Sequence, residues 1–200
     1  MTSPRLRLRA DASRNRERIL EAAREAIRDC GTEVSLNEVA RRAGVGNATV
    51  YRHFATRGEL IHQATLSSIS VLAEEAEQVL AQETDVFETL RHFMHRLLGE
   101  GIGTLCPFVA DVGGTTAPEV DQAWKRLEHV LEALMIQARE AGRLRADVDV
   151  DDLVIALAQL TRPLPGTVYA DFQQSAHRHL RLFLDGLRVP AQSARPGPPA

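Results

Sequence analysis

A short stretch around residue 50 contains side chains of the kinds that contact nucleic acid. Carboxamide, hydroxyl and guanidinium groups hydrogen-bond to base edges and phosphates, and an alanine methyl can contact the methyl group of thymine. If residues 48–54 form a helix, Val50 and Phe54 lie one turn apart and face inward together. The side chains that remain largely outward are those of Asn47, Ala48, Thr49, Tyr51, Arg52 and His53.

The residues upstream predict a first helix that positions this stretch. Ser35 and Glu38 have the spacing of a capping box, in which the hydroxyl accepts from the third helical amide and the carboxylate reaches back to the amide of the cap. A helix therefore begins at Leu36, and Gly44 ends it because glycine adopts the left-handed conformation without steric cost. We expect Asn47 to cap the second helix. Two short helices joined by a glycine turn are the plan of a helix-turn-helix, whose second helix enters the DNA major groove.

A second capping box follows this stretch directly. Thr56 and Glu59 repeat the S/T-x-x-E spacing and predict that the next helix begins near Arg57. Because the first amides of a helix attract anions, Arg57 and this helix end can bind a phosphate together. The whole cluster predicts a DNA-binding unit near the N-terminus.

The same residues resemble those of the TetR/AcrR family of bacterial transcriptional regulators. The resemblance rests on the LNEVARRAGV helix and turn, the TVYRHF recognition helix and the TRGEL entry to the following helix. Residues 18–30 are similar to the first helix of the family. Beyond this first part of the chain, only the length and the helical layout agree. Gly46 stands where a serine is common in the family, and Ala48 stands where a glycine is common.

The resemblance also implies a role for each outward side chain. Asn47, Ala48 and Thr49 are expected to approach base edges, and Arg52 can serve either bases or phosphates. The implied phosphate contacts are Ser35, Tyr51, His53 and Arg57. For the tyrosine and the histidine, the alternative is that they are partly buried packing residues.

Charge is distributed unequally along the 200 residues, which have a net charge of −3. Residues 1–60 hold 12 arginines against 8 acidic residues, a net of +4, and the remainder has a net of −7. The positive end is the end with the helix-turn-helix, as attraction to phosphate requires. A solvated surface is the general alternative for such an asymmetry, but its coincidence with the motif favours DNA binding.

Composition and spacing argue against several other classes of protein. No run approaches the roughly 18 apolar residues of a membrane helix, and no apolar signal region starts the chain, so a cytoplasmic protein is expected. Cys30 and Cys106 are far apart in sequence, which argues against a disulfide framework. His92 and His95 resemble half a metal site, but no carboxylate or cysteine at ligand spacing completes it. The sequence shows no nucleophile paired with a base, so we expect neither an enzyme nor a cofactor.

The two ends of the chain are expected to lie outside the folded core. Residues 1–12 alternate arginines with leucines before any helical pattern and predict a flexible arm. This arm either contacts the minor groove or phosphates, or it is a disordered solubilising tail. Residues 188–200 are rich in Pro, Gly, Ser and Ala and predict a second disordered tail.

Between these ends the sequence predicts an all-α fold in two domains. Residues 13–58 form the helix-turn-helix domain, and residues 59–187 form a larger helical domain. Apolar periodicity and helix breakers predict about nine helical segments. Outside the motif these segments are residues 13–30, 57–82, 86–99, 105–112, 118–141, 150–162 and 167–187.

The resemblance implies that the larger domain dimerises and binds a ligand. In the family the last two helices pair with their twofold mates in a four-helix bundle, and helices four to seven enclose a small-molecule pocket. A homodimer is also expected on physical grounds, because a single helix-turn-helix contacts too few bases, whereas a dimer reads a pseudo-palindromic operator. An unidentified effector would favour a second conformation and release a repressor from the operator. A protein-binding adaptor and an all-helical enzyme are the alternatives.

The sequence identifies the candidate ligand pocket less clearly than the DNA-binding unit. The apolar candidates for its lining are Phe93, Leu97, Phe108, Trp124, Leu127 and Met135. The polar candidates are His92, His95 and Gln159. The alternative for every apolar candidate is an ordinary place in the hydrophobic core.

Overall fold

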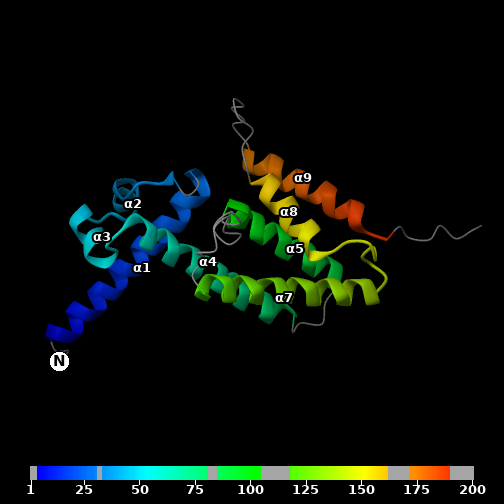
Figure 1. Ribbon diagram of the computed structural model, residues 1–200, viewed down its shortest axis with the longest axis horizontal. Coiled ribbons are helices and arrows are strands. Elements are labelled where there is room, and N and C mark those ends of the chain that lie inside the picture. The colour runs from blue at the N-terminus through cyan, green and yellow to red at the C-terminus, as the bar shows by residue number, and fades with distance from the viewer. Residues whose placement is uncertain (1–3, 31–32, 81–84, 105–117, 162–171, 190–200) are drawn as a thin grey trace, which may run out of the picture.

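The computed structural model describes residues 4–30, 33–80, 85–104, 118–161 and 172–189 (Figure 1). Within these ranges the regular elements are helices, and extended pairing is limited to an isolated bridge between Leu144 and Arg188. The all-α fold expected from the sequence is therefore confirmed. Among the described helices, none combines the length and the apolarity that crossing a membrane needs.

Helix α1 (Pro4–Cys30) begins earlier than the sequence predicted. The apolar pattern places its start near residue 13 and residues 4–12 in a flexible arm, but these residues form the first turns of the helix. Proline is tolerated in a first helical turn, and arginine, leucine and alanine have high helix propensity. The arginine-rich segment therefore extends the helix.

Helix α2 (Leu36–Ala43) has the predicted bounds. The Oγ atom of Ser35 accepts from the Glu38 amide at 3.2 Å, which is one half of the predicted capping box. Gly44 ends the helix with a φ of 62°, and its amide donates to carbonyl groups in the last turn. The glycine is needed here because this left-handed conformation disfavours other residues.

Helix α3 (Asn47–His53) starts one residue before the predicted position. Its cap is Gly46, so the prediction that Asn47 caps it was wrong. The extended backbone of Gly46 aims its carbonyl at the amides of residues 49 and 50, and both donate to it. Asn47 is thereby the first helical residue, and its side chain is available for contacts outside the helix.

Helix α4 (Arg57–Leu80) connects the helix-turn-helix to the larger domain (Figure 1). Its 24 residues span about 36 Å at the usual rise per residue. The other described helices of that domain are α5 (Val86–Gly99), α7 (Pro118–Glu140), α8 (Val150–Leu160) and α9 (Phe172–Leu187). A helical turn at residues 102–104 follows α5, and the expected segment at 105–112 lies outside the described residues.

Helix α7 supplies the middle of the hydrophobic core. It packs against both α4 and α5. The apolar side chains that follow a heptad-like spacing along α7 are all buried: Val120, Trp124, Leu127, Leu131, Leu134 and Ala138. Burying each large apolar side chain stabilises the fold by about 1.5–3 kcal/mol before the entropy of ordering is counted.

The start of the predicted C-terminal tail is held against the core. The Val189 amide donates to the Arg143 carbonyl at 3.0 Å. The Arg188 guanidinium lies 4.6 Å from the centroid of the Phe87 ring and pairs with Glu88 at 2.6 Å. The prediction that disorder begins at residue 188 was therefore wrong, because a backbone pairing and a cation–π contact position these two residues.

Candidate nucleic-acid interface

Helix α3 presents a polar face to solvent and is held from behind by apolar side chains. Its exposed residues are Asn47, Ala48, Tyr51 and Arg52, while Thr49 and His53 are half-buried. Tyr51 is 56% exposed, which rules out the alternative of a packing role for it. The ring of His53 lies 6.5 Å from that of Phe54, so packing remains an alternative for the histidine. Val50 is fully buried beneath the polar face.

Phe54 anchors the C-terminal end of α3 and contacts α1. Its ring is 1% exposed, and the Arg16 guanidinium lies 5.3 Å from the ring centroid. Arg16 also donates to Oε1 of Gln63 in α4 at 3.1 Å. One arginine of α1 thus contacts both the residue that ends α3 and a side chain of α4.

A pair of carboxamides joins the two short helices at the exposed edge. Nδ2 of Asn47 donates to Oδ1 of Asn37 at 2.8 Å. The contact connects the first turn of α3 with α2 and leaves the remaining polar groups of Asn47 toward solvent. Sequence reasoning missed Asn37, because the partner lies ten positions away and follows no helical spacing.

The carboxylate of Glu38 binds arginines of its own helix. It accepts from Nε of Arg41 at 2.8 Å and from Nε of Arg42 at 2.7 Å, which differs from the reciprocal half of the predicted capping box. Hydrogen bonds from Arg41 and then Arg42 lower the pKa of Glu38 to about 2. Arg42 also reaches Asp29 of α1 at 2.5 Å, so the cluster fastens α2 to α1.

Arg57 connects the start of α4 to the segment that precedes α2. Its Nε donates to the Val34 carbonyl at 2.8 Å, and its Nη2 lies 3.7 Å from the Glu33 carboxylate. The Oγ1 atom of Thr56 accepts from the Glu59 amide at 3.0 Å, as the second capping box predicts. Arg57 thus has a structural role in addition to the phosphate contact that the sequence predicts.

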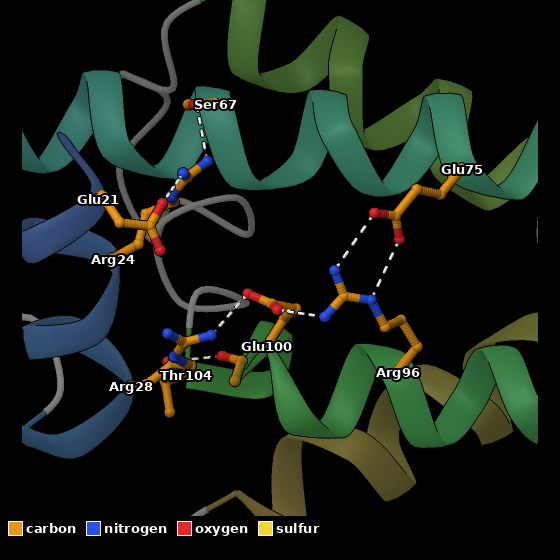
Figure 2. A network of polar contacts seen from close by, with 9 residues as sticks. Glu21, Arg24, Arg28, Ser67, Glu75, Arg96, Glu100 and Thr104 are labelled. Carbon is orange, nitrogen blue, oxygen red and sulfur yellow. Dashed lines mark hydrogen bonds and ion pairs between the residues drawn. The ribbon is translucent and has the colours of Figure 1, made fainter. Parts of the chain in front are cut away.

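Polar contacts also join this unit to the larger domain (Figure 2). Nη1 of Arg24 in α1 donates to Oγ of Ser67 in α4 at 3.1 Å. Nη1 of Arg28 donates to Oε2 of Glu100, just after α5, at 2.8 Å. The last two turns of α1 are therefore held to two different elements of the core.

Arg96 extends these contacts within the larger domain (Figure 2). It donates to both carboxylate oxygens of Glu75 in α4, at 3.1 and 3.2 Å, and it also contacts Glu100. A cavity of about 140 Å³ lies beside this cluster. Its lining is Glu21, Arg24, Ser68, Val71, Leu72, Arg96 and Glu100.

The residues predicted to line an apolar pocket lie elsewhere. Phe93, Leu97, Trp124, Leu127 and Met135 are all buried in the hydrophobic core of the described residues. Phe108 lies outside the described residues. Of the polar candidates for the lining, His92 and Gln159 are exposed and His95 is half-buried. In this structure the described apolar candidates therefore occupy ordinary positions in the hydrophobic core. Their part in a ligand site stays a prediction.

Tertiary packing brings together two histidines that the sequence separates. The Nδ1 atoms of His95 in α5 and His177 in α9 lie 2.9 Å apart, and the rings stack with an interplanar angle of 24°. Burial, followed by the charges of His177 and Arg91, lowers the pKa of His95. Within the described residues, no group of three or more His, Cys, Asp and Glu side chains is arranged to hold a metal ion.

Helices α8 and α9 leave apolar side chains in solvent. Ile155 of α8 is 54% exposed and Leu182 of α9 is 60% exposed. The two helices pack against each other and lie at the edge of the molecule (Figure 1). A contiguous exposed apolar patch is a common mark of a protein–protein contact, whereas single exposed apolar side chains are ordinary on a protein surface.

Both parts of the chain match known protein families. Residues 19–64 match the family described as bacterial regulatory proteins, tetR family. Residues 83–189, more than half of the chain, match the C-terminal domain described as transcriptional regulator SbtR-like. The first match contains α2, α3 and the C-terminal part of α1 from residue 19, and the second contains α5, α7, α8 and α9.

Solved structures extend the similarity over the whole fold. A TetR transcriptional regulator from Streptomyces coelicolor is 31% identical, with 88% of this chain and 99% of that chain covered and a TM-score of 0.63. A TetR transcription regulatory protein from Mycobacterium vanbaalenii is 34% identical, with 91% and 99% covered and a TM-score of 0.60.

A curated relative is similar over a shorter range. It is an HTH-type transcriptional regulator from Staphylococcus aureus (strain USA300), 28% identical over 92 residues. The alignment covers 46% of this chain and 50% of the relative, so this chain spans about half the length of the curated relatives that it matches. By name, these relatives are regulators of transcription.

Proposed function

The chain belongs to the TetR family of bacterial transcriptional regulators, and from this premise we propose that it is a homodimeric repressor released from its operator by a small molecule. The observation that supports DNA recognition most directly is the polar face of α3. Its exposed side chains stand on a buried anchor formed by Val50 and Phe54. Such a helix keeps its orientation while it presents polar groups to base edges.

The proposed contacts divide into two groups. Asn47 and Thr49 read base edges by hydrogen bonds, and Ala48 contacts a base through its methyl group. The phosphate contacts are Ser35, Tyr51, His53 and Arg57, with Arg52 serving either group. This division is supported by position, because the base readers lie in the first turn of α3.

The proposed dimer forms through α8 and α9. Ile155 and Leu182 are exposed on these helices, and a twofold contact would bury both of them in each subunit. We propose that residues 13–58 form the DNA-binding domain, and that residues 59–187 hold the dimer contact and the ligand site. Two recognition helices at a fixed spacing would then read the two halves of an inverted repeat in cytoplasmic DNA.

To release the protein from its operator, the effector must favour one of two conformations of the protein. Helix α4 reaches from the recognition unit into the core, so a shift of its C-terminal half would change the spacing of the recognition helices. FadR from Bacillus subtilis, solved in complex with stearoyl-CoA, has a similar fold at 16% identity and a TM-score of 0.57. That likeness concerns the fold alone.

The test is selection of bound sequences from random duplex DNA by the purified full chain. We expect enrichment of an inverted repeat, and an affinity for it that falls steeply as salt is raised. The matched control is Tyr51→Ala, which removes one proposed phosphate contact from an exposed side chain. If folded protein enriches no sequence at low salt, the repressor proposal fails and a protein-binding adaptor becomes the better reading.

A further inference from the structure

Residues 100–103, which follow α5, pass close to α1 of the DNA-binding unit. Gly101 has a φ of 68°, in the left-handed region that favours glycine. A Cβ atom at this position would lie 3.0 Å from Cγ and 3.5 Å from Cα of Arg28. The turn therefore lies against α1, and a side chain at residue 101 would press on the side chain of Arg28.

The same turn also packs against the last turn of α8. A Cβ atom on Gly103 would lie 2.3 Å from the carbonyl oxygen of Leu157 and 2.3 Å from Oγ1 of Thr161. The carbonyl belongs to the backbone of α8 and cannot turn aside as a flexible side chain can. Because packed interiors are nearly incompressible, a displacement of α8 here displaces the turn as well.

Glu100 adds a charged contact at the same place (Figure 2). Its carboxylate accepts from Arg28 of α1 and from Arg96 of α5, and Arg96 in turn binds Glu75 of α4. The side chains of Arg28 and Glu100 are 24% and 20% exposed. At this burial the ion pair is screened less than a surface pair, and its loss leaves charges that are only partly hydrated.

We propose that residues 100–103 are a connector that sets the orientation of the DNA-binding helices relative to α8, with Glu100 as its positioning residue. Helix α8 also presents Ile155 at the proposed dimer contact, so the connector would join that contact to α1. The effect on DNA rests on the proposed function, whereas the effect on orientation within the chain does not. A loosened connector lowers the fraction of dimers with the recognition helices at operator spacing.

The orientation can be measured without DNA by spin labels on the full chain. Labels go on Glu17→Cys in α1 and Glu132→Cys in α7, both exposed, in a chain whose two native cysteines are serine. Labelled chains are diluted with unlabelled ones, so that each dimer contains at most one labelled pair. We expect Glu100→Gln to broaden or shift the distribution of label distances.

Matched variants separate the connector from ordinary loss of an ion pair. Arg126→Gln removes a pair of similar chemistry, since Arg126 of α7 binds Glu77 of α4 at 2.6 Å, and it should leave the distribution unchanged. Arg28→Gln should reproduce the effect of Glu100→Gln, and Arg28→Lys, which keeps the charge, should restore most of the original distribution. Equal distributions for Glu100→Gln, Arg28→Gln and the parent chain overturn the connector.

Gly103→Ala tests the contact with α8 independently of charge. We expect it to shift the same distance distribution, provided that circular dichroism shows a helical content equal to that of the parent chain. If it fails to fold, the ion-pair variants still decide the question. A folded Gly103→Ala chain with an unchanged distribution overturns the link to α8.

The DNA measurement uses the operator found by selection. We expect Glu100→Gln to weaken binding to it by about fivefold or more, a typical size for coupling between sites, and Arg126→Gln to change it less than about twofold. A changed label distance with unchanged operator affinity overturns the regulatory part of this inference. If no operator exists, the proposed function fails, while the distance measurement still decides whether the connector is real.

Discussion

The helix-turn-helix and the junction at residues 100–103 depend on contacts that differ in their separation along the chain. In the helix-turn-helix, Ser35 and Thr56 cap helices by accepting from amides three positions away. At the junction, Arg28 and Glu100 are separated by 72 positions. Local contacts form wherever their own segment folds, whereas the junction exists only after α1, α5 and α8 have packed. The comparison predicts which substitutions change stability, DNA reading or domain orientation.

The largest effect is expected where the recognition unit itself depends on tertiary packing. Phe54→Ala should lower the free energy of unfolding by about 3–5 kcal/mol, because it removes a buried ring and leaves a cavity. Denaturant unfolding followed by circular dichroism measures this change. The control is Tyr51→Ala, whose exposed ring should change stability by about 0.5 kcal/mol or less. Coincident unfolding curves for the two variants would mean that local caps alone hold α3.

The next effect concerns the division between base readers and phosphate contacts. Thr49→Ala should cost about 1–3 kcal/mol of discrimination at one base-pair position in each half-site, with little change at other positions. Tyr51→Ala should weaken binding to all sequences alike, with little change in the dependence of affinity on salt, because the lost phenol carries no charge. Competition titrations with single-base operator variants distinguish the two patterns. The same pattern from both variants would contradict the division.

A smaller effect should follow loss of a helix cap. Thr56→Ala removes the hydroxyl that accepts from the Glu59 amide, and we expect a loss of about 1 kcal/mol in the free energy of unfolding. Asn47→Ala is the matched control, because its side chain makes no cap and should cost less. Thermal and urea unfolding of both variants measure the difference. A larger loss for the asparagine variant would mean that its contact with Asn37 matters more than a cap.

The smallest effect is a dependence of stability on pH at the contact between α5 and α9. The pKa of His95 is lowered by burial and by nearby positive groups, first His177 and then Arg91, Arg181 and His92. The unfolded chain therefore takes up this proton at a higher pH than the folded chain. The free energy of unfolding should fall as pH decreases below about 6.5, and stability should be retained above it.

His95→Gln tests this assignment, because the carboxamide can still hydrogen-bond to His177 but does not titrate. Urea unfolding at about pH 5.5 and about pH 7.5 should show a smaller loss of stability on acidification for this variant than for the parent chain. His92→Gln, at an exposed position of the same helix, is the control. An equal loss for all three chains would assign the pH dependence to other groups.

Much of the fold was predictable because its signals are local. The predicted bounds of α2 and α5 agree with the structure, and the apolar seam of α7 is buried throughout. The errors have equally local causes. Helix α1 starts at Pro4 because residues of high helix propensity extend it, and α3 starts after Gly46 because the cap needs only an extended backbone and a carbonyl.

The candidate interface was predictable in position but not in detail. Asn47, Ala48, Tyr51 and Arg52 are exposed on α3 as the helical spacing indicated. The contacts of Asn47 with Asn37 and of Arg57 with the Val34 carbonyl could not be read from spacing, because each joins segments that meet only after the helices pack.

By itself, the sequence determined an all-α chain with a helix-turn-helix near its N-terminus. Capping residues, glycine stops and apolar periodicity act within a few positions, so they can be read without coordinates. Only the tertiary structure decided what the glycines after α5 do. In the sequence they are helix breakers, but in the fold Gly101 contacts α1 and Gly103 contacts α8, with Glu100 paired to Arg28. These contacts depend on the paths of distant backbone segments, which no local pattern specifies.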